Sequence, residues 1–148
     1  MRAAYIENAE QWMEEFQFSV EVKVRFSETD MYGHLNNTVP FTYFEMARIE
    51  YLKSLGLMTD WTSPNSETIP VVADLQCDFL QQVFFDESLR IFVKAAKIGS
   101  SSVDVHYLAK NGDNLPVFTG RGTIVQINRQ TGKAQAWSEH TKQLMLAK

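Results

Sequence analysis

The alternation of hydrophobic and polar positions predicts one strand, one long helix and then four further strands. Val20, Val22 and Val24 alternate with charged residues, and this period of two is typical of a half-buried strand. From about Thr38 to Leu55 the spacing becomes helical. The apolar face of that helix consists of Phe41, Phe44, Ala47, Tyr51, Leu52 and Leu55. The later strand-like runs lie at about 69–80, 88–98, 102–110 and 116–128.

A helix with an aromatic-rich face needs a sheet to cover it, and each predicted strand offers one apolar face. We therefore predict an α+β fold in which an antiparallel sheet of about five strands is wrapped around one long central helix. Residues 1–18 carry a shorter amphipathic pattern, which predicts a helical extension that packs on the domain or on a partner subunit. Residues 19–148 form the domain itself, in which Ser138 can cap a short helix that runs through Leu146.

Composition narrows the function classes. The 148 residues fit one domain, and a net charge of −4 argues against binding to nucleic acid, which requires basic surface. No apolar run approaches the ~18 residues of a membrane span, so the expected location is the cytoplasm. The single cysteine, Cys77, is expected to be a buried small hydrophobe. The three histidines and this cysteine lack the spacing of metal ligands, so no metal is expected.

The polar loop at residues 27–37, between the first strand and the long helix, concentrates the candidate chemistry. It contains Asp30, Gly33, His34 and two asparagines just before a helix start. Backbone N–H groups at a helix start lack intrahelical partners and can stabilise an oxyanion. A nearby carboxylate can attack a carbonyl or activate water, and a glycine lets the chain turn tightly and approach a ligand. The residues alone leave another interpretation open, in which Asp30 and His34 only satisfy amides of the loop.

Three stretches of the sequence resemble the signature of the hot-dog-fold acyl-CoA thioesterases, in the branch of 4-hydroxybenzoyl-CoA thioesterase. They are residues 24–30 (VRFSETD), 33–37 (GHLNN) and 43–48 (YFEMAR). The resemblance implies hydrolysis of an acyl or aroyl thioester to the free acid and CoA, with no cofactor beyond the coenzyme A of the substrate. It implies that Asp30 is the nucleophile or general base, that the amide near Asn37 polarises the carbonyl, and that His34 supports water or substrate.

The sequence departs from relatives of this family at two places. Tyr32 stands where plant acyl-carrier-protein thioesterases have a catalytic asparagine, and Pro40 stands where a tyrosine is common. The acyl group and its carrier, CoA or acyl-carrier protein, therefore stay open. The candidate substrate contacts are Tyr32, Gly33, Trp61, Ser101, Ser102 and Arg121, of which Arg121 is one of several cations that could meet the CoA nucleotide. The resemblance also implies a homodimer or homotetramer with sites formed between subunits.

Two other functions are compatible with the same fold, namely a non-hydrolytic acyl-CoA-binding protein and an enoyl-CoA hydratase or dehydratase. A binding protein has no need of a carboxylate at the carbonyl, so Asp30 favours hydrolysis. Outside the loop, His106 is expected to face solvent or a partner, because it lies opposite the apolar face of its strand, and His140 is expected to be exposed. The glycines of Gly120-Arg121-Gly122 are expected to mark a bulge or a close approach within a strand.

Overall fold

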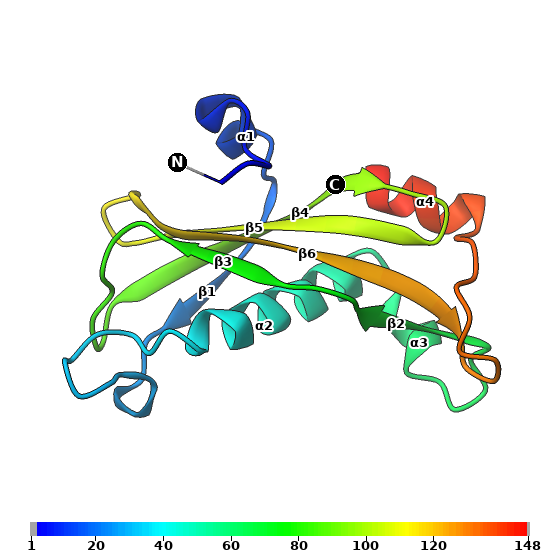
Figure 1. Cartoon of the computed structure of the whole chain (residues 1–148), viewed down its shortest axis with the longest axis horizontal. Coiled ribbons are helices and arrows are strands. Elements are labelled where there is room, and N and C mark those ends of the chain that lie inside the picture. The colour runs from blue at the N-terminus through cyan, green and yellow to red at the C-terminus, as the bar shows by residue number, and fades with distance from the viewer. Residues whose placement is uncertain (1–2, 148) are drawn as a thin grey trace.

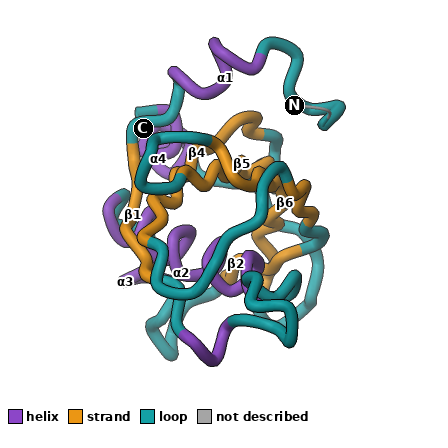
Figure 2. The backbone as a smooth tube through the Cα atoms, turned by 90° about the vertical axis from the view of Figure 1, so that its left-hand side faces the viewer, coloured by secondary structure: helices purple, strands orange, loops and turns teal. Residues whose placement is uncertain are grey.

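An antiparallel sheet curls around one long helix in the computed structural model, which describes residues 3–147 (Figures 1 and 2). The helix is α2 (Val39–Ser54), and it lies in the concave face of the sheet. The six strands are β1 (Phe18–Lys23), β2 (Thr68–Val72), β3 (Gln76–Phe79), β4 (Ser88–Ile98), β5 (Ser102–Lys110) and β6 (Pro116–Asn128). Their order is β1-β4-β5-β6-β2, and β3 also pairs with β6. The fold is the predicted α+β hot-dog architecture.

The apolar face of α2 fills the core against β4, β5 and β6. Its Phe44 ring stacks on Tyr107 of β5 with ring centroids 4.4 Å apart. A side chain at Gly120 of β6 would collide with the same ring, so the glycine permits the close approach that the sequence predicted. Pro40 occupies the first turn of α2, where its missing N–H is not needed, and Gly56 follows the helix end with a φ of 81°.

The predicted strand at 69–80 is divided into β2 and β3, and the sheet therefore has six strands where about five were predicted. Both strands pair with β6, but Val72 faces Ile124 whereas Gln76 faces Arg121. The segment from Val72 to Gln76 thus contains one more residue than the paired segment of β6, and the extra residue forms a bulge. Asp74 in this bulge accepts the N–H of Thr123 at 2.7 Å, so the extra residue still satisfies a strand amide.

Three short helices and one 3-10 turn complete the fold. They are α1 (Ala9–Glu14), η1 (Phe26–Glu28), α3 (Met58–Trp61) and α4 (Glu139–Leu146). Helix α1 is shorter than the predicted 1–18, of which residues 1 and 2 lie outside the described part, and α3 is a short helix that the sequence pattern did not predict. Ser138 caps α4 as predicted by accepting the N–H of Thr141. No helix within residues 3–147 is long and apolar enough to cross a membrane.

The N-terminal segment covers the outer face of the sheet, opposite α2 (Figure 1). It buries His106 of β5, which is only 6% exposed and accepts the indole N–H of Trp12 at its Nδ1 at 2.9 Å. The prediction that His106 faces solvent or a partner is therefore wrong. The strand alternation does place it away from the apolar core, but the N-terminal segment covers that face. Helix α1 thus packs on its own domain, one of the two predicted roles.

Candidate active site

The polar loop after β1 closes into a tight turn that fixes the Asp30 carboxylate. The N–H of Asp30 donates to the carbonyl of His34 at 2.8 Å, and the N–H of Gly33 donates to the carbonyl of Asp30 at 3.0 Å. Gly33 has a φ of 79°, in the left-handed region that side-chain-bearing residues disfavour. Asp30 Oδ1 accepts the N–H groups of Tyr32 at 2.9 Å and His34 at 3.2 Å. The turn thus orients the carboxylate through one of its oxygens.

The Asp30 carboxylate borders a pocket of about 310 Å³. Its other oxygen, Oδ2, has no hydrogen-bond donor among residues 3–147. The polar lining of the pocket consists of Asp30, His34, Asn37, Gln81 and Gln82, and the apolar lining of Leu35, Phe79, Leu80, Val83 and Phe118. The pocket therefore places a carboxylate, an imidazole and a helix start at one end of an apolar wall.

At the start of α2, the backbone N–H of Asn37 lies beside this pocket. Asn36 forms an Asx turn just before the helix, because its Oδ1 accepts the N–H and the hydroxyl of Thr38, the N-cap residue, each at 3.1 Å. Its carbonyl accepts the N–H of Val39 at 3.0 Å. No acceptor for the N–H of Asn37 lies within the described residues. The sequence singled out Asn37 and missed the Asx turn of Asn36, which the preference of asparagine for such turns could have indicated.

The loop at residues 80–87 contacts the polar loop that carries Asp30. The N–H of Leu35 donates to the carbonyl of Val83 at 2.6 Å, and His34 forms a bridge with Phe84. The imidazole of His34 packs edge-on against the Phe84 ring, with centroids 5.1 Å apart. The apolar wall and the catalytic candidates therefore belong to one connected unit, although they are about 50 residues apart in sequence.

Glu28 lies buried at the base of the loop, a position that the sequence analysis did not single out. Burial favours its neutral form, but hydrogen bonds from the Arg25 N–H, the Tyr43 hydroxyl and the Arg25 guanidinium outweigh burial and hold the pKa of the carboxyl below its usual value. Burial and the same hydrogen bond to Glu28 raise the pKa of Tyr43. Glu28 is therefore an ionised acceptor and Tyr43 its protonated donor.

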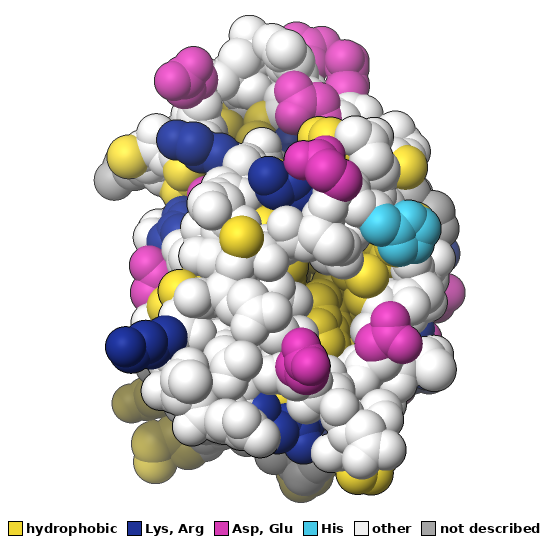
Figure 3. All heavy atoms as spheres, turned by 90° about the vertical axis from the view of Figure 1, so that its right-hand side faces the viewer, with side chains coloured by type: hydrophobic (Ala, Val, Ile, Leu, Met, Phe, Trp, Pro, Cys, Tyr) yellow, Lys and Arg dark blue, Asp and Glu magenta, His cyan; other side chains and the backbone are white. Residues whose placement is uncertain are grey.

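The end of the molecule opposite the Asp30 pocket carries Trp61, Ser101 and Ser102. Trp61 of α3 packs on Trp137, with ring centroids 6.1 Å apart, at the edge of a separate hollow of about 250 Å³. Figure 3 shows this end of the molecule, where hydrophobic side chains lie at the bottom of a hollow between acidic ones. The carbonyl of Ser102 accepts the Trp137 indole N–H at 3.0 Å. Within one chain these residues do not meet Asp30, whereas exposed Tyr32 and Gly33 lie in its loop.

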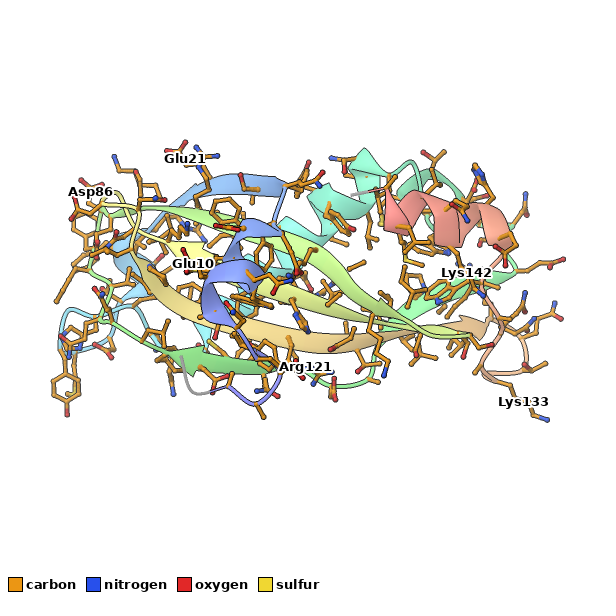
Figure 4. The ribbon with its side chains drawn as sticks, turned by 90° about the horizontal axis from the view of Figure 1, so that it is seen from above. Glu10, Glu21, Asp86, Arg121, Lys133 and Lys142 are labelled. Carbon is orange, nitrogen blue, oxygen red and sulfur yellow. The ribbon has the colours of Figure 1, made fainter. Side chains whose placement is uncertain are left out.

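The predicted cation Arg121 lies on the outer face of β6, near the N-terminal segment (Figure 4). Its guanidinium binds the carboxylates of Asp104 and Asp74. Lys94 of β4 is a second cation on this face; it is buried, and its ammonium donates to Glu15 at 2.7 Å and to the carbonyl of Trp12 at 3.0 Å. Both cations therefore have partners within the chain and lie on the face of the sheet opposite α2.

Cys77 of β3 is half-buried and packs against the main core. Burial, and then the neighbouring Asp78 carboxylate, raise the pKa of its thiol to about 12. The thiol therefore stays protonated near neutral pH and behaves as a small hydrophobe, although it is half-buried where the sequence predicted a buried one.

Comparisons with known proteins show the family of the chain. Residues 24–145 match the thioesterase-like superfamily. The chain is 46% identical over 144 residues to the uncharacterized protein YsmA of Bacillus subtilis, an alignment that covers 97% of this chain and 95% of that protein. It is 29% identical over 121 residues to the chloroplastic acyl-acyl carrier protein thioesterase ATL3 of Arabidopsis thaliana, covering 80% of this chain and 62% of the plant protein.

Two solved structures show the same architecture. One is a thioesterase from Thermus thermophilus complexed with coenzyme A and Zn, which is 27% identical with a TM-score of 0.75, covering 91% of this chain and 96% of that one. The other is the DHNA-CoA thioesterase from Staphylococcus aureus, which is 22% identical with a TM-score of 0.75, covering 86% of this chain and 90% of that one. The second likeness concerns the fold alone.

Proposed function

This chain belongs to the thioesterase-like superfamily and is a thioester hydrolase, and we propose that it cleaves an acyl-CoA thioester in the pocket that Asp30 borders. One observation carries the proposal. A carboxylate oxygen without a protein donor and an unused helix-start N–H border the same partly apolar pocket. The coenzyme A bound to the Thermus relative supports CoA as the carrier, and the plant relative makes acyl-carrier protein the alternative.

In this mechanism the thioester carbonyl lies between Asn37 and Asp30. The N–H of Asn37 donates to the carbonyl oxygen and stabilises the negative charge that develops there, an effect typically worth about 10²–10³ in rate for one donor. His34 holds water or the substrate at the mouth of the pocket. The helix-start amide acts as a fixed dipole that needs no rearrangement during the reaction.

Asp30 acts through its free oxygen in one of two ways. As a general base, it removes a proton from water while the water oxygen attacks the carbonyl carbon. As a nucleophile, it attacks the carbon itself and forms an acyl-aspartate anhydride that water then hydrolyses. In both routes the carbon–sulfur bond breaks, and the sulfur leaves as a thiolate that takes up a proton.

The size of the pocket suggests the size of the acyl group. The pocket has about 310 Å³ within one chain, with an apolar wall on one side. The wall of Leu80, Val83 and Phe118 suits a medium-length aliphatic chain or a single aromatic ring. We therefore expect acyl groups of this size to be hydrolysed faster than long-chain ones.

A panel of acyl-CoAs with detection of the free thiol tests the proposal. Asp30→Asn keeps the shape of the side chain but removes the base or nucleophile, and we expect kcat to fall by about 10²–10⁴-fold. Asp113→Asn, at an exposed turn between β5 and β6, is the matched control and should keep wild-type activity. The assignment of Asp30 fails if its variant folds normally and retains full activity. An enoyl-CoA in the panel separates hydrolysis from hydration, because only hydrolysis releases a thiol.

A further inference from the structure

The Glu28 carboxylate lies beside the proposed reaction site without bordering the pocket. Its Oε1 accepts the N–H of Arg25 and the hydroxyl of Tyr43, each at 2.8 Å, and its Oε2 lies 3.3 Å from the Arg25 guanidinium. The Arg25 side chain is 75% exposed, so water screens its charge. Tyr43 is only 2% exposed, and its hydroxyl is therefore the buried partner of this carboxylate.

This hydrogen bond joins the two parts of the active site. Glu28 lies two residues before Asp30, and Tyr43 lies in the second turn of α2. The backbone of Glu28 also takes part, because its carbonyl accepts the N–H of Asn36 at 2.8 Å. Glu28 thus binds α2 through its side chain and, through its main chain, the residue that immediately precedes Asn37.

A buried ionised carboxylate is unfavourable if it serves stability alone. Burying an ionised group opposes folding, and well-packed apolar side chains of similar volume often stabilise a protein at least as well. A hydrogen bond differs from an apolar contact in being directional, since it weakens steeply once the donor moves out of line. The bond between Glu28 and Tyr43 therefore restricts sliding or rotation of α2 against the loop more sharply than packing would.

We propose that Glu28 and Tyr43 are positioning residues for hydrolysis, which hold the start of α2 where the Asn37 N–H and the Asp30 carboxylate reach the same thioester carbonyl. The inference rests on the function proposed above. Neither residue lines the pocket, so both act through Asn36 and α2. A displacement of about 1 Å at a reacting centre can cost about 10²-fold in rate, so a small shift of α2 is enough to be measured.

Steady-state kinetics of Tyr43→Phe, Glu28→Ala and the double variant test this role. We expect kcat to fall by about 10- to 100-fold in Tyr43→Phe with little change in KM, because the acyl pocket is intact. The double variant should lose about as much as the worse single variant, since the same bond is removed once. Glu28→Gln keeps an acceptor and should retain more activity than Glu28→Ala.

The matched control is Tyr107→Phe, which also removes a buried tyrosine hydroxyl, here one that accepts from Arg48 at 3.1 Å. It should lower the melting temperature without changing kcat. If Tyr43→Phe and Glu28→Ala also lower the melting temperature but keep the wild-type kcat, their role is structural and the inference is overturned. Asp30→Asn distinguishes failure of the proposed function from failure of this inference, because full activity of that variant would overturn the proposed function whatever the Tyr43 variant does.

Discussion

Gly33 is the residue on which the shape of the Asp30 turn depends most directly. Its φ of 79° is disfavoured for any side-chain-bearing residue, although a Cβ there would meet nothing within 4 Å. Gly33→Ala should therefore lower the free energy of unfolding by about 1–2 kcal/mol through backbone strain alone, measured by urea denaturation. Gly112→Ala is the control, because Gly112 also has open space but no positive φ, and it should change stability by less than about 0.5 kcal/mol. Equal effects of the two substitutions would contradict this explanation.

At the level of residues, the sequence predicted what is local and missed what depends on distant contacts. Asp30, His34 and Asn37 lie within eight residues of chain, so one loop brings them to one pocket. Phe118 joins them only because β3 and β6 pair, and no local pattern marks it as a pocket residue. Glu28 stands in a polar run where burial is not expected, and its partner Tyr43 lies 15 residues further on.

Among the elements, the N-terminal segment should respond to pH through His106. Burial lowers the pKa of this imidazole from its usual 6.5, and the Asp104 carboxylate opposes the shift only in part. The groups around the ring are Tyr5 and Glu15 of the N-terminal segment, Lys94 of β4, Asp104 of β5 and Arg121 of β6. Protonation of Nδ1 would also remove the acceptor of the Trp12 indole N–H.

The neutral imidazole is thus favoured in the folded state, and the unfolded state binds the proton more readily. This contribution to stability is complete above pH 6.5 and is lost as the pH falls below that value toward the folded-state pKa. The slope is at most about 1.4 kcal/mol per pH unit for one proton. Urea denaturation at several pH values in this range gives the free energy of unfolding as a function of pH. Its slope against pH should be smaller for His106→Asn than for the wild type, whereas His140→Asn, at an exposed site, should keep the wild-type slope. An unchanged slope in His106→Asn would refute the assignment.

The elements themselves were largely predictable, because period-two and helical patterns follow directly from burial on one face. Strands β4, β5 and β6 coincide with the predicted runs 88–98, 102–110 and 116–128. The division of β2 from β3 was not predictable, since a bulge of one residue changes pairing with β6 without breaking the pattern of β2 and β3 themselves. The burial of His106 was missed for a related reason, because a strand pattern does not reveal what covers its polar face.

At the scale of the whole molecule, large apolar side chains are exposed around the mouth of the Asp30 pocket. They are Phe26, Met31, Tyr32, Phe79, Leu80, Phe84 and Phe85. Beside them, β3 pairs with no strand other than β6 among the described residues, so one of its edges is open. A group of exposed apolar side chains next to an open strand edge favours association with another chain. We therefore expect a second copy of this chain to cover this surface and to contribute to the pocket.

Light scattering coupled to size-exclusion chromatography should then find a homodimer or a larger assembly of the wild type. Phe85 is 52% exposed and does not line the pocket. Full burial of such a side chain is worth about 1.5–3 kcal/mol, so Phe85→Ser should weaken dimerisation by about 10- to 100-fold. Leu146→Ser, at a 66% exposed leucine of α4 at the other end of the molecule, should leave association unchanged. A monomeric wild type, or equal weakening by both substitutions, would exclude this surface as the interface, whereas selective weakening with a parallel loss of thioesterase activity would indicate that the pocket is completed by the second subunit.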